Sequence, residues 1–105
     1  MIRHCVFINF SGGVTDSHKR ELFDNIEALQ KNLPGIMAVH VGANVSPETG
    51  MDKGFSDGFV VDFVDAAARD AYLMDPDHGK AGAGLTAAAE GGAAGIMVYD
   101  IEIPD

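Results

Sequence analysis

A tyrosine and a histidine, Tyr72 and His78, are the side chains of this sequence best suited to acid–base chemistry. An imidazole exchanges protons near neutral pH, and a phenol can donate a hydrogen bond to an oxygen that develops negative charge. Pro76 stands between them, and a turn at this proline would return the imidazole to the phenol. In the alternative interpretation, the tyrosine packs on the core and the histidine caps a helix end.

The other residues with metal-binding or nucleophilic potential form no motif. None of the four histidines stands four positions from another, and Cys5 is the only cysteine, so the sequence has no metal-ligand spacing. Two histidines can still meet in space, but we expect no metal. Gly82-x-Gly84-x-x-Ala87 has dinucleotide-loop spacing but follows a turn rather than a strand, so we expect no nucleotide and no other cofactor. Cys5 is expected to be a small buried hydrophobic residue.

Composition and charge narrow the possible partners. The chain has 105 residues, 47% of them hydrophobic, which fits a single globular domain over residues 1–105. Its formal net charge of −9 repels phosphates, so we expect neither nucleic-acid binding nor attachment to an anionic membrane. No apolar run approaches the ~20 residues that cross a bilayer, and the N-terminal residues lack signal-peptide features. A single cysteine fits the reducing cytoplasm, which is the expected location.

The spacing of apolar residues predicts four strands and three helical segments. The expected strands are residues 2–10, 36–45, 57–64 and 96–103. The expected helices are residues 15–33, 65–74 and a weak one at 79–90, because glycine disfavours helix. This is the ferredoxin-like β-α-β-β-α-β order of the α+β class. Short connections favour a four-stranded antiparallel sheet in the order 4-1-3-2, with the helices on one face.

Both faces of the expected sheet carry apolar side chains, although helices cover only one of them. The apolar residues on one face are Val6, Ile8, Phe10, Phe59, Val61 and Phe63, and those on the other are Cys5, Phe7, Val60 and Val64. An uncovered apolar face needs a partner. A second copy of the chain is the simplest one, so we expect a homodimer whose two sheets pack together.

Short segments spread over about residues 1–103 form a pattern that is shared with a known family. They are Ile2-Arg3-His4, Leu33-Pro34-Gly35-Ile36, Gly42, Lys53-Gly54-Phe55, Tyr72-Leu73, Asp75-Pro76-Asp77-His78 and Val98-Tyr99-Asp100-Ile101. In order and spacing they resemble the stress-responsive A/B barrel (Dabb) domain. The resemblance implies the dimeric α+β barrel fold, in which two ferredoxin-like protomers pack their sheets together.

The resemblance also implies roles for single residues. A plant member of the family, an aldol-type polyketide cyclase, uses a histidine and a tyrosine that match His78 and Tyr72. Its further pocket histidines match His4 and the position of Asp57, so the aspartate changes the charge of the implied pocket. The glycines that follow His78 stand where the family usually has bulkier apolar residues, which implies a wider pocket.

Strand periodicity agrees with a small-molecule pocket between the sheet and the helices. The expected lining residues are His4, Asp57, Phe59 and Val61, which share the covered face of the first and third strands. Tyr72 and His78 are its expected catalytic pair. If Asp57 lies close to His78, its charge favours the imidazolium, raises the pKa of His78 and makes it a weaker base.

Three functions remain open at this point. The leading hypothesis is proton-transfer chemistry on a carbonyl compound, such as an aldol cyclisation or a lyase step, with His78 as base and Tyr72 as oxyanion donor. The first alternative is a ligand-binding or stress protein without catalysis. The second is a cofactor-free oxygenase of the dimeric α+β barrel type, which acts on a phenolic or quinol substrate.

Overall fold

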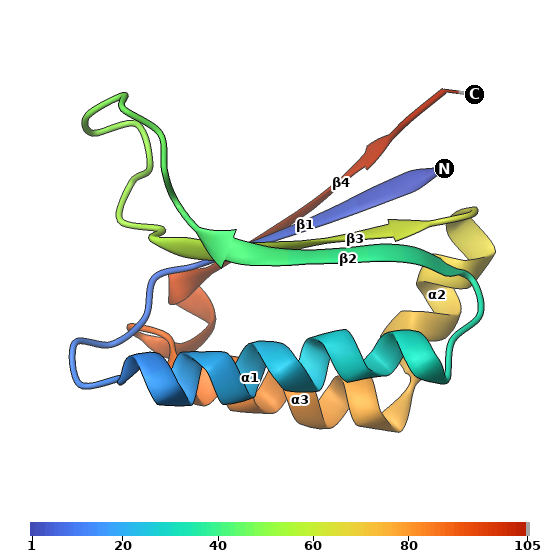
Figure 1. Cartoon of the computed structure of the whole chain (residues 1–105), viewed down its shortest axis with the longest axis horizontal. Helices are drawn as coiled ribbons and strands as arrows, with labels where there is room; N and C mark the ends of the chain where they lie inside the picture. Colours follow the sequence, from blue (N-terminus) through green and yellow to red (C-terminus); the bar gives the residue numbers. More distant parts are fainter. Residues whose placement is uncertain (105) are drawn as a thin grey trace.

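The computed structural model describes residues 1–104 and has one antiparallel sheet with helices on one face (Figure 1). The strands are β1 (Ile2–Ile8), β2 (Ile36–Ala43), β3 (Asp57–Phe63) and β4 (Ile96–Glu102). The helices are α1 (Asp16–Ala28), α2 (Ala66–Met74) and α3 (Pro76–Ala88), with short 3-10 turns η1 (Leu29–Lys31) and η2 (Gly92–Gly95). The order β2-β3-β1-β4 is the expected order read from the other edge, and the ferredoxin-like α+β fold is confirmed.

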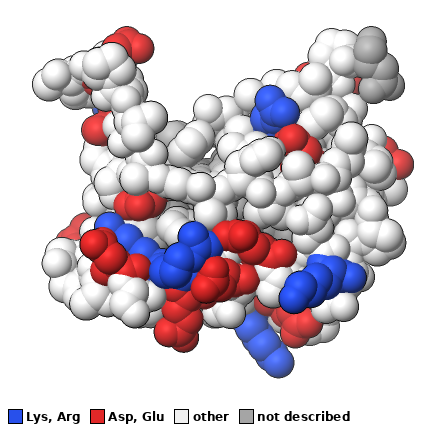
Figure 2. Space-filling view, in the orientation of Figure 1, with Lys and Arg blue, Asp and Glu red and all other residues white. Residues whose placement is uncertain are grey.

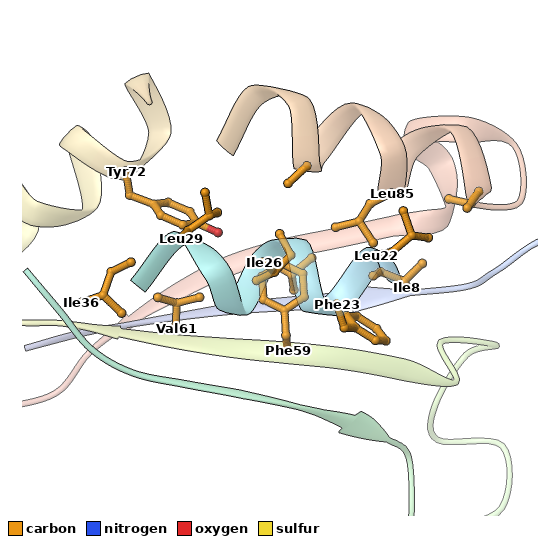
Figure 3. Packing of buried hydrophobic residues seen from close by; sticks show 14 of the residues in the cluster. Ile8, Leu22, Phe23, Ile26, Leu29, Ile36, Phe59, Val61, Tyr72 and Leu85 are labelled. Carbon is orange, nitrogen blue, oxygen red and sulfur yellow. The ribbon is translucent and has the colours of Figure 1, made fainter. Parts of the chain in front are cut away.

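The hydrophobic core lies between the helices and the inner face of the sheet, the face that they cover. Residues directly opposite one another in antiparallel strands point to the same side, and Val6 of β1 lies between Phe59 of β3 and Val98 of β4. Figure 3 shows Ile8, Phe59 and Val61 of the inner face meeting the apolar stripe of α1 and Leu85 of α3. The largest fully buried side chains are Tyr72, Phe63, Ile8, Ile26 and Val61.

A single residue, Asp75, separates α2 from α3. Its extended backbone, at φ −71° and ψ 132°, ends α2, and its carboxylate accepts hydrogen bonds from the backbone N–H groups of Asp77 and His78 at 2.9 and 3.2 Å. Pro76 then occupies the first helical turn, where its missing N–H is not needed. The expected start of this helix at residue 79 is therefore wrong. The Asp-Pro pair that ends α2 also caps and begins α3, so His78 lies in the first turn of α3.

Two strands end two residues before the positions that alternation predicts, and β3 and β4 end one residue before them. β1 stops at Ile8 rather than at residue 10, because the Asn9 N–H donates to the carbonyl of Gly95 at 2.8 Å and Phe10 forms only an isolated bridge with Ala89. β2 stops at Ala43 rather than at residue 45. The first helix is likewise shorter, since α1 ends at Ala28 and only η1 continues it. At the ends of β1, β2 and α1, the spacing of apolar side chains continues although the regular backbone hydrogen bonding has ended.

The second face of the sheet is open and largely apolar. The exposed apolar residues of β4 on this face are Met97, Tyr99 and Ile101, at 40%, 46% and 44% exposure. In the same face, the Arg3 guanidinium donates to both carboxylate oxygens of Asp62 at 2.8 and 3.1 Å. The loop between β2 and β3 rises above this side (Figure 1), and a groove of about 430 Å³ lies between the loop and the sheet.

Charged side chains gather over the helical layer in the view of Figure 2, whereas the open side of the sheet is mostly uncharged there. On α1, for example, Arg20 pairs with Asp24 at 2.7 Å and also with Glu27. Such exposed pairs add little stability but keep this side hydrated. Within residues 1–104, no helix has the length and apolar character to cross a membrane.

Two glycines in the C-terminal third differ in the space available for the methyl group of an alanine. Substituting alanine for each should therefore change the free energy of unfolding in opposite directions. A Cβ at Gly79 in α3 meets no atom within 4 Å, so Gly79→Ala should raise the free energy of unfolding by ~0.5–1 kcal/mol through helix propensity. A Cβ at Gly95 would lie 2.5 Å from the backbone oxygen of Glu90, so Gly95→Ala should lower it by ~1–3 kcal/mol. Urea denaturation of both variants checks this, and a stabilising Gly95→Ala would contradict the packing described here.

Candidate functional site

Tyr72 lies at the centre of a cluster of rings beneath the inner face of the sheet. Its side chain comes from α2 and is 1% exposed, and its ring centroid is 4.3 Å from that of His78 and 5.7 Å from that of His4. Figure 3 shows the phenol reaching into the layer between helices and sheet. Within residues 1–104 its hydroxyl has no hydrogen-bond partner, and burial raises the pKa of Tyr72 well above its usual value. The phenol is thus a protonated and unsatisfied donor.

His78 is half-buried at the start of α3, where the Asp75 cap holds its backbone. Burial is the main cause that lowers the pKa of His78 below 6.5, and the neighbouring His4 lowers it further. The charge of Asp75 and a hydrogen bond to the backbone of Leu73 act in the opposite direction and offset only part of the shift. The imidazole of His78 is therefore neutral at pH 7 and able to accept a proton.

His4 stands on β1 and is held by a chain of two charged groups. Its Nδ1 lies 2.6 Å from Oδ1 of Asp100 on β4, and Oδ2 of Asp100 accepts a hydrogen bond at 2.6 Å from Nη1 of Arg69 on α2. Burial acts to raise the pKa of Asp100, but the hydrogen bonds from Arg69 and His4 outweigh it and lower the pKa below 3.8. Asp100 is therefore a carboxylate at neutral pH.

A pocket of about 210 Å³ opens beside this cluster, between α3 and the sheet. Its polar walls are His4, His78 and Thr86, and its apolar walls include Val6, Ile26, Phe59, Leu85, Ile96 and Val98. Val98 points to the inner face yet is 54% exposed, so the pocket is open along the edge strand β4. A cavity of about 150 Å³ holds benzene, which has six non-hydrogen atoms, so by the same ratio this one has room for roughly eight.

The structure brings together His4, Phe59, Tyr72 and His78 from the sequence-predicted site, but not Asp57 and Val61. Asp57 lies opposite Ile8, whereas His4 lies opposite Val61, so Asp57 and His4 are about 13 Å apart along the strands. Asp57 binds Ser56 Oγ at 2.6 Å and Lys19 Nζ at 3.4 Å instead.

The expected influence of Asp57 on His78 is absent for this reason, and the pKa of His78 is lowered rather than raised. Val61 is fully buried in the core and does not line the pocket. The other two histidines, His18 and His40, are exposed. Within residues 1–104, no group of three or more His, Cys, Asp or Glu side chains is placed to hold a metal ion.

Asp100 and Arg69 are the members of the cluster that sequence reasoning missed. A signal for Asp100 existed, because the expected strand order puts the last strand beside the first and alternation then turns this carboxylate toward the inner face near His4. Arg69 had no such signal. Its contact with Asp100 depends on how α2 packs, and helix periodicity alone does not determine that.

Because the Tyr72 hydroxyl is buried without a hydrogen-bond partner within residues 1–104, its removal should stabilise the protein. Tyr72→Phe should raise the free energy of unfolding by ~1 kcal/mol, because it removes a buried polar group without leaving a large cavity. Tyr72→Ala is the matched control and should lower it by ~3–5 kcal/mol. Thermal and urea denaturation measure both. If Tyr72→Phe is clearly destabilising, the hydroxyl has a partner in solution and is not an orphan.

Comparisons with known proteins agree with this architecture. A crystal structure from Jannaschia sp. CCS1, described as a dimeric ferredoxin-like protein of unknown function, is 32% identical, with a TM-score of 0.90 over 97% of this chain and 98% of that one. A protein from Arabidopsis thaliana is 20% identical, with a TM-score of 0.87 over 100% and 97%. A hydroxynitrile lyase from Passiflora edulis is 18% identical, with a TM-score of 0.84 over 99% and 94%.

None of the curated proteins matches the chain. The family model of the stress responsive A/B barrel domain, in contrast, matches residues 2–103. That match covers almost every element described above, from β1 to the end of β4. The chain therefore belongs to the stress-responsive A/B barrel (Dabb) domain family.

Proposed function

We propose that this chain is a cytoplasmic homodimer whose pocket binds a small carbonyl compound and moves a proton on it, as in an aldol cyclisation or a lyase step. His78 is the general base that removes a proton next to the carbonyl group. Tyr72 donates a hydrogen bond to the carbonyl oxygen as that oxygen gains negative charge. Neither step requires a cofactor.

The observation that carries the proposal is the Tyr72 hydroxyl, which is buried and has no hydrogen-bond partner within residues 1–104, on a ring that packs against the ring of His78. A buried unsatisfied donor costs ~1–3 kcal/mol, and a ligand oxygen that accepts from it would recover this cost on binding. Tyr72 is not among the residues that line the pocket and its hydroxyl is buried, so the hydroxyl meets a ligand only after neighbouring side chains move. Hydrogen bonds of this kind are often incomplete before a ligand is bound.

Proton exchange on a simple ketone tests this mechanism without knowledge of the natural substrate. The wild-type protein should speed up the exchange of the methyl protons of acetophenone in deuterium oxide, followed by NMR. His78→Gln should slow the catalysed exchange by about 10²–10⁴-fold, and Tyr72→Phe by about 10²–10³-fold. His18→Gln, on an exposed histidine, should leave the rate unchanged.

The same assay has a defined pH dependence. Because only neutral His78 accepts a proton and its pKa is lowered, the rate should stay at its plateau at pH 7 and fall on the acid side with a midpoint below 6.5. A midpoint above 6.5 contradicts the environment described for His78. Binding without exchange would favour the non-catalytic alternative, and oxygen uptake with a phenol or quinol would favour the oxygenase.

The homodimer is supported by the open apolar face and by relatives that are described as dimeric. Phe7 lies on that face against Tyr99, at a ring-centroid distance of 6.0 Å. Phe7→Asp should therefore split or unfold the dimer, because it buries an unpaired charge at the contact between sheets.

Light scattering should give twice the chain mass for the wild type and a monomer or an unfolded chain for Phe7→Asp. Met74→Asp, on a residue that is 83% exposed at the end of α2, is the control and should stay dimeric. A wild-type protein that is monomeric at micromolar concentration would refute this assembly.

A further inference from the structure

The two ring nitrogens of His4 have different surroundings. Nδ1 lies 2.6 Å from the Asp100 carboxylate, whereas Nε2 has no hydrogen-bond partner within residues 1–104 and, unlike the Tyr72 hydroxyl, is not sealed from solvent. The His4 side chain is only 5% exposed and lines the 210 Å³ pocket, so the accessible part of its ring faces that pocket. A ligand in the pocket therefore meets Nε2.

The partners of Asp100 determine where the imidazole proton sits. An ionised carboxylate only accepts hydrogen bonds, so Nδ1 must carry a hydrogen in order to be bonded to it. Arg69 donates to the second oxygen of Asp100, which holds the carboxylate in place with its first oxygen toward His4. In the neutral ring, a proton on Nδ1 leaves Nε2 as a bare acceptor.

We infer that Asp100, held by Arg69, is a positioning residue that fixes His4 with its proton on Nδ1, so that Nε2 accepts a hydrogen bond from the ligand. The pocket then offers an acceptor at His4 and a base at His78, and the ring cluster beside it adds a donor at Tyr72 once side chains move. It suits a small apolar molecule that carries a hydroxyl group close to its carbonyl group, such as a hydroxyketone or the enol of a dicarbonyl compound. This ligand class rests on the proposed function, whereas the assignment of the His4 proton to Nδ1 does not.

Asp100→Asn is the decisive variant. Arg69 can donate only to the amide oxygen of the asparagine, and this turns the amide NH₂ toward His4. Nδ1 must then accept, the ring proton moves to Nε2, and the acceptor in the pocket is lost. Asp70→Asn is the matched control, because Asp70 also binds Arg69, at 2.9 Å, but is 67% exposed and has no contact with His4.

Nitrogen-15 NMR of the histidine rings reads the tautomer directly. We expect a proton on Nδ1 of His4 in the wild type and in Asp70→Asn at pH 7, and on Nε2 in Asp100→Asn. A wild-type ring with its proton on Nε2, or with both nitrogens protonated, would overturn the inference. So would an Asp100→Asn protein that folds and keeps the wild-type tautomer.

Binding of two matched probes tests the ligand class. From the worth of one hydrogen bond, 2-acetylpyrrole, whose ring N–H can only donate, should bind the wild type and Asp70→Asn about tenfold more tightly than 2-acetylthiophene, and Asp100→Asn should bind the two alike. An unchanged ratio in Asp100→Asn contradicts the inference. If the ratio changes as expected but no proton exchange is catalysed, the catalytic proposal alone fails. If neither ketone binds, both the ligand class and the proposed function are contradicted. The NMR spectrum still decides which nitrogen of His4 carries the proton.

Discussion

The relative position of Tyr72 and His78 depends on one residue, Asp75. Its backbone ends α2 after Met74, and its side chain begins α3 by accepting two backbone N–H groups. Because no loop intervenes, the last turn of one helix and the first turn of the next are held at a fixed angle. The rings of Tyr72 and His78 consequently lie 4.3 Å apart between their centroids. A longer connection would leave the two side chains on helices that are free to move independently.

The central strand β1 joins the pocket to the open face of the sheet. Alternation sends His4 toward the helices and its neighbours Arg3 and Cys5 to the opposite side. Arg3 is tied to Asp62 of β3 on the open face, and His4 is tied to Asp100 of β4 on the inner face. The same strand is thus anchored to both of its neighbours by polar side-chain contacts, one on each side. Whatever packs against the open face also restrains the wall of the pocket.

Sequence patterns were sufficient for the strand order, the covered face and the meeting of His4 with Tyr72 and His78, because these follow from alternation, helix periodicity and the Asp-Pro junction. They were insufficient for Asp57, which shares the face of His4 but lies too far along the strand. Face and register are separate properties, and only pairing fixes register. Ion pairs between distant elements, such as Arg69 with Asp100, depend on helix packing and have no local signature.

The ring cluster beside the pocket contains a polar group that lowers the stability of the folded domain. An unpartnered buried hydroxyl costs ~1–3 kcal/mol, which is a sizeable part of the ~5–15 kcal/mol that stabilises a typical domain. The core around it gives no structural reason for the oxygen, since phenylalanine would fill the same space and Phe63 already packs against the ring at 5.1 Å. His78 is likewise kept neutral by burial rather than stabilised by an ionic partner. A buried hydroxyl that weakens the folded state, on a ring that one helix junction packs against a neutral histidine, is more readily explained by a bound molecule than by the stability of the fold.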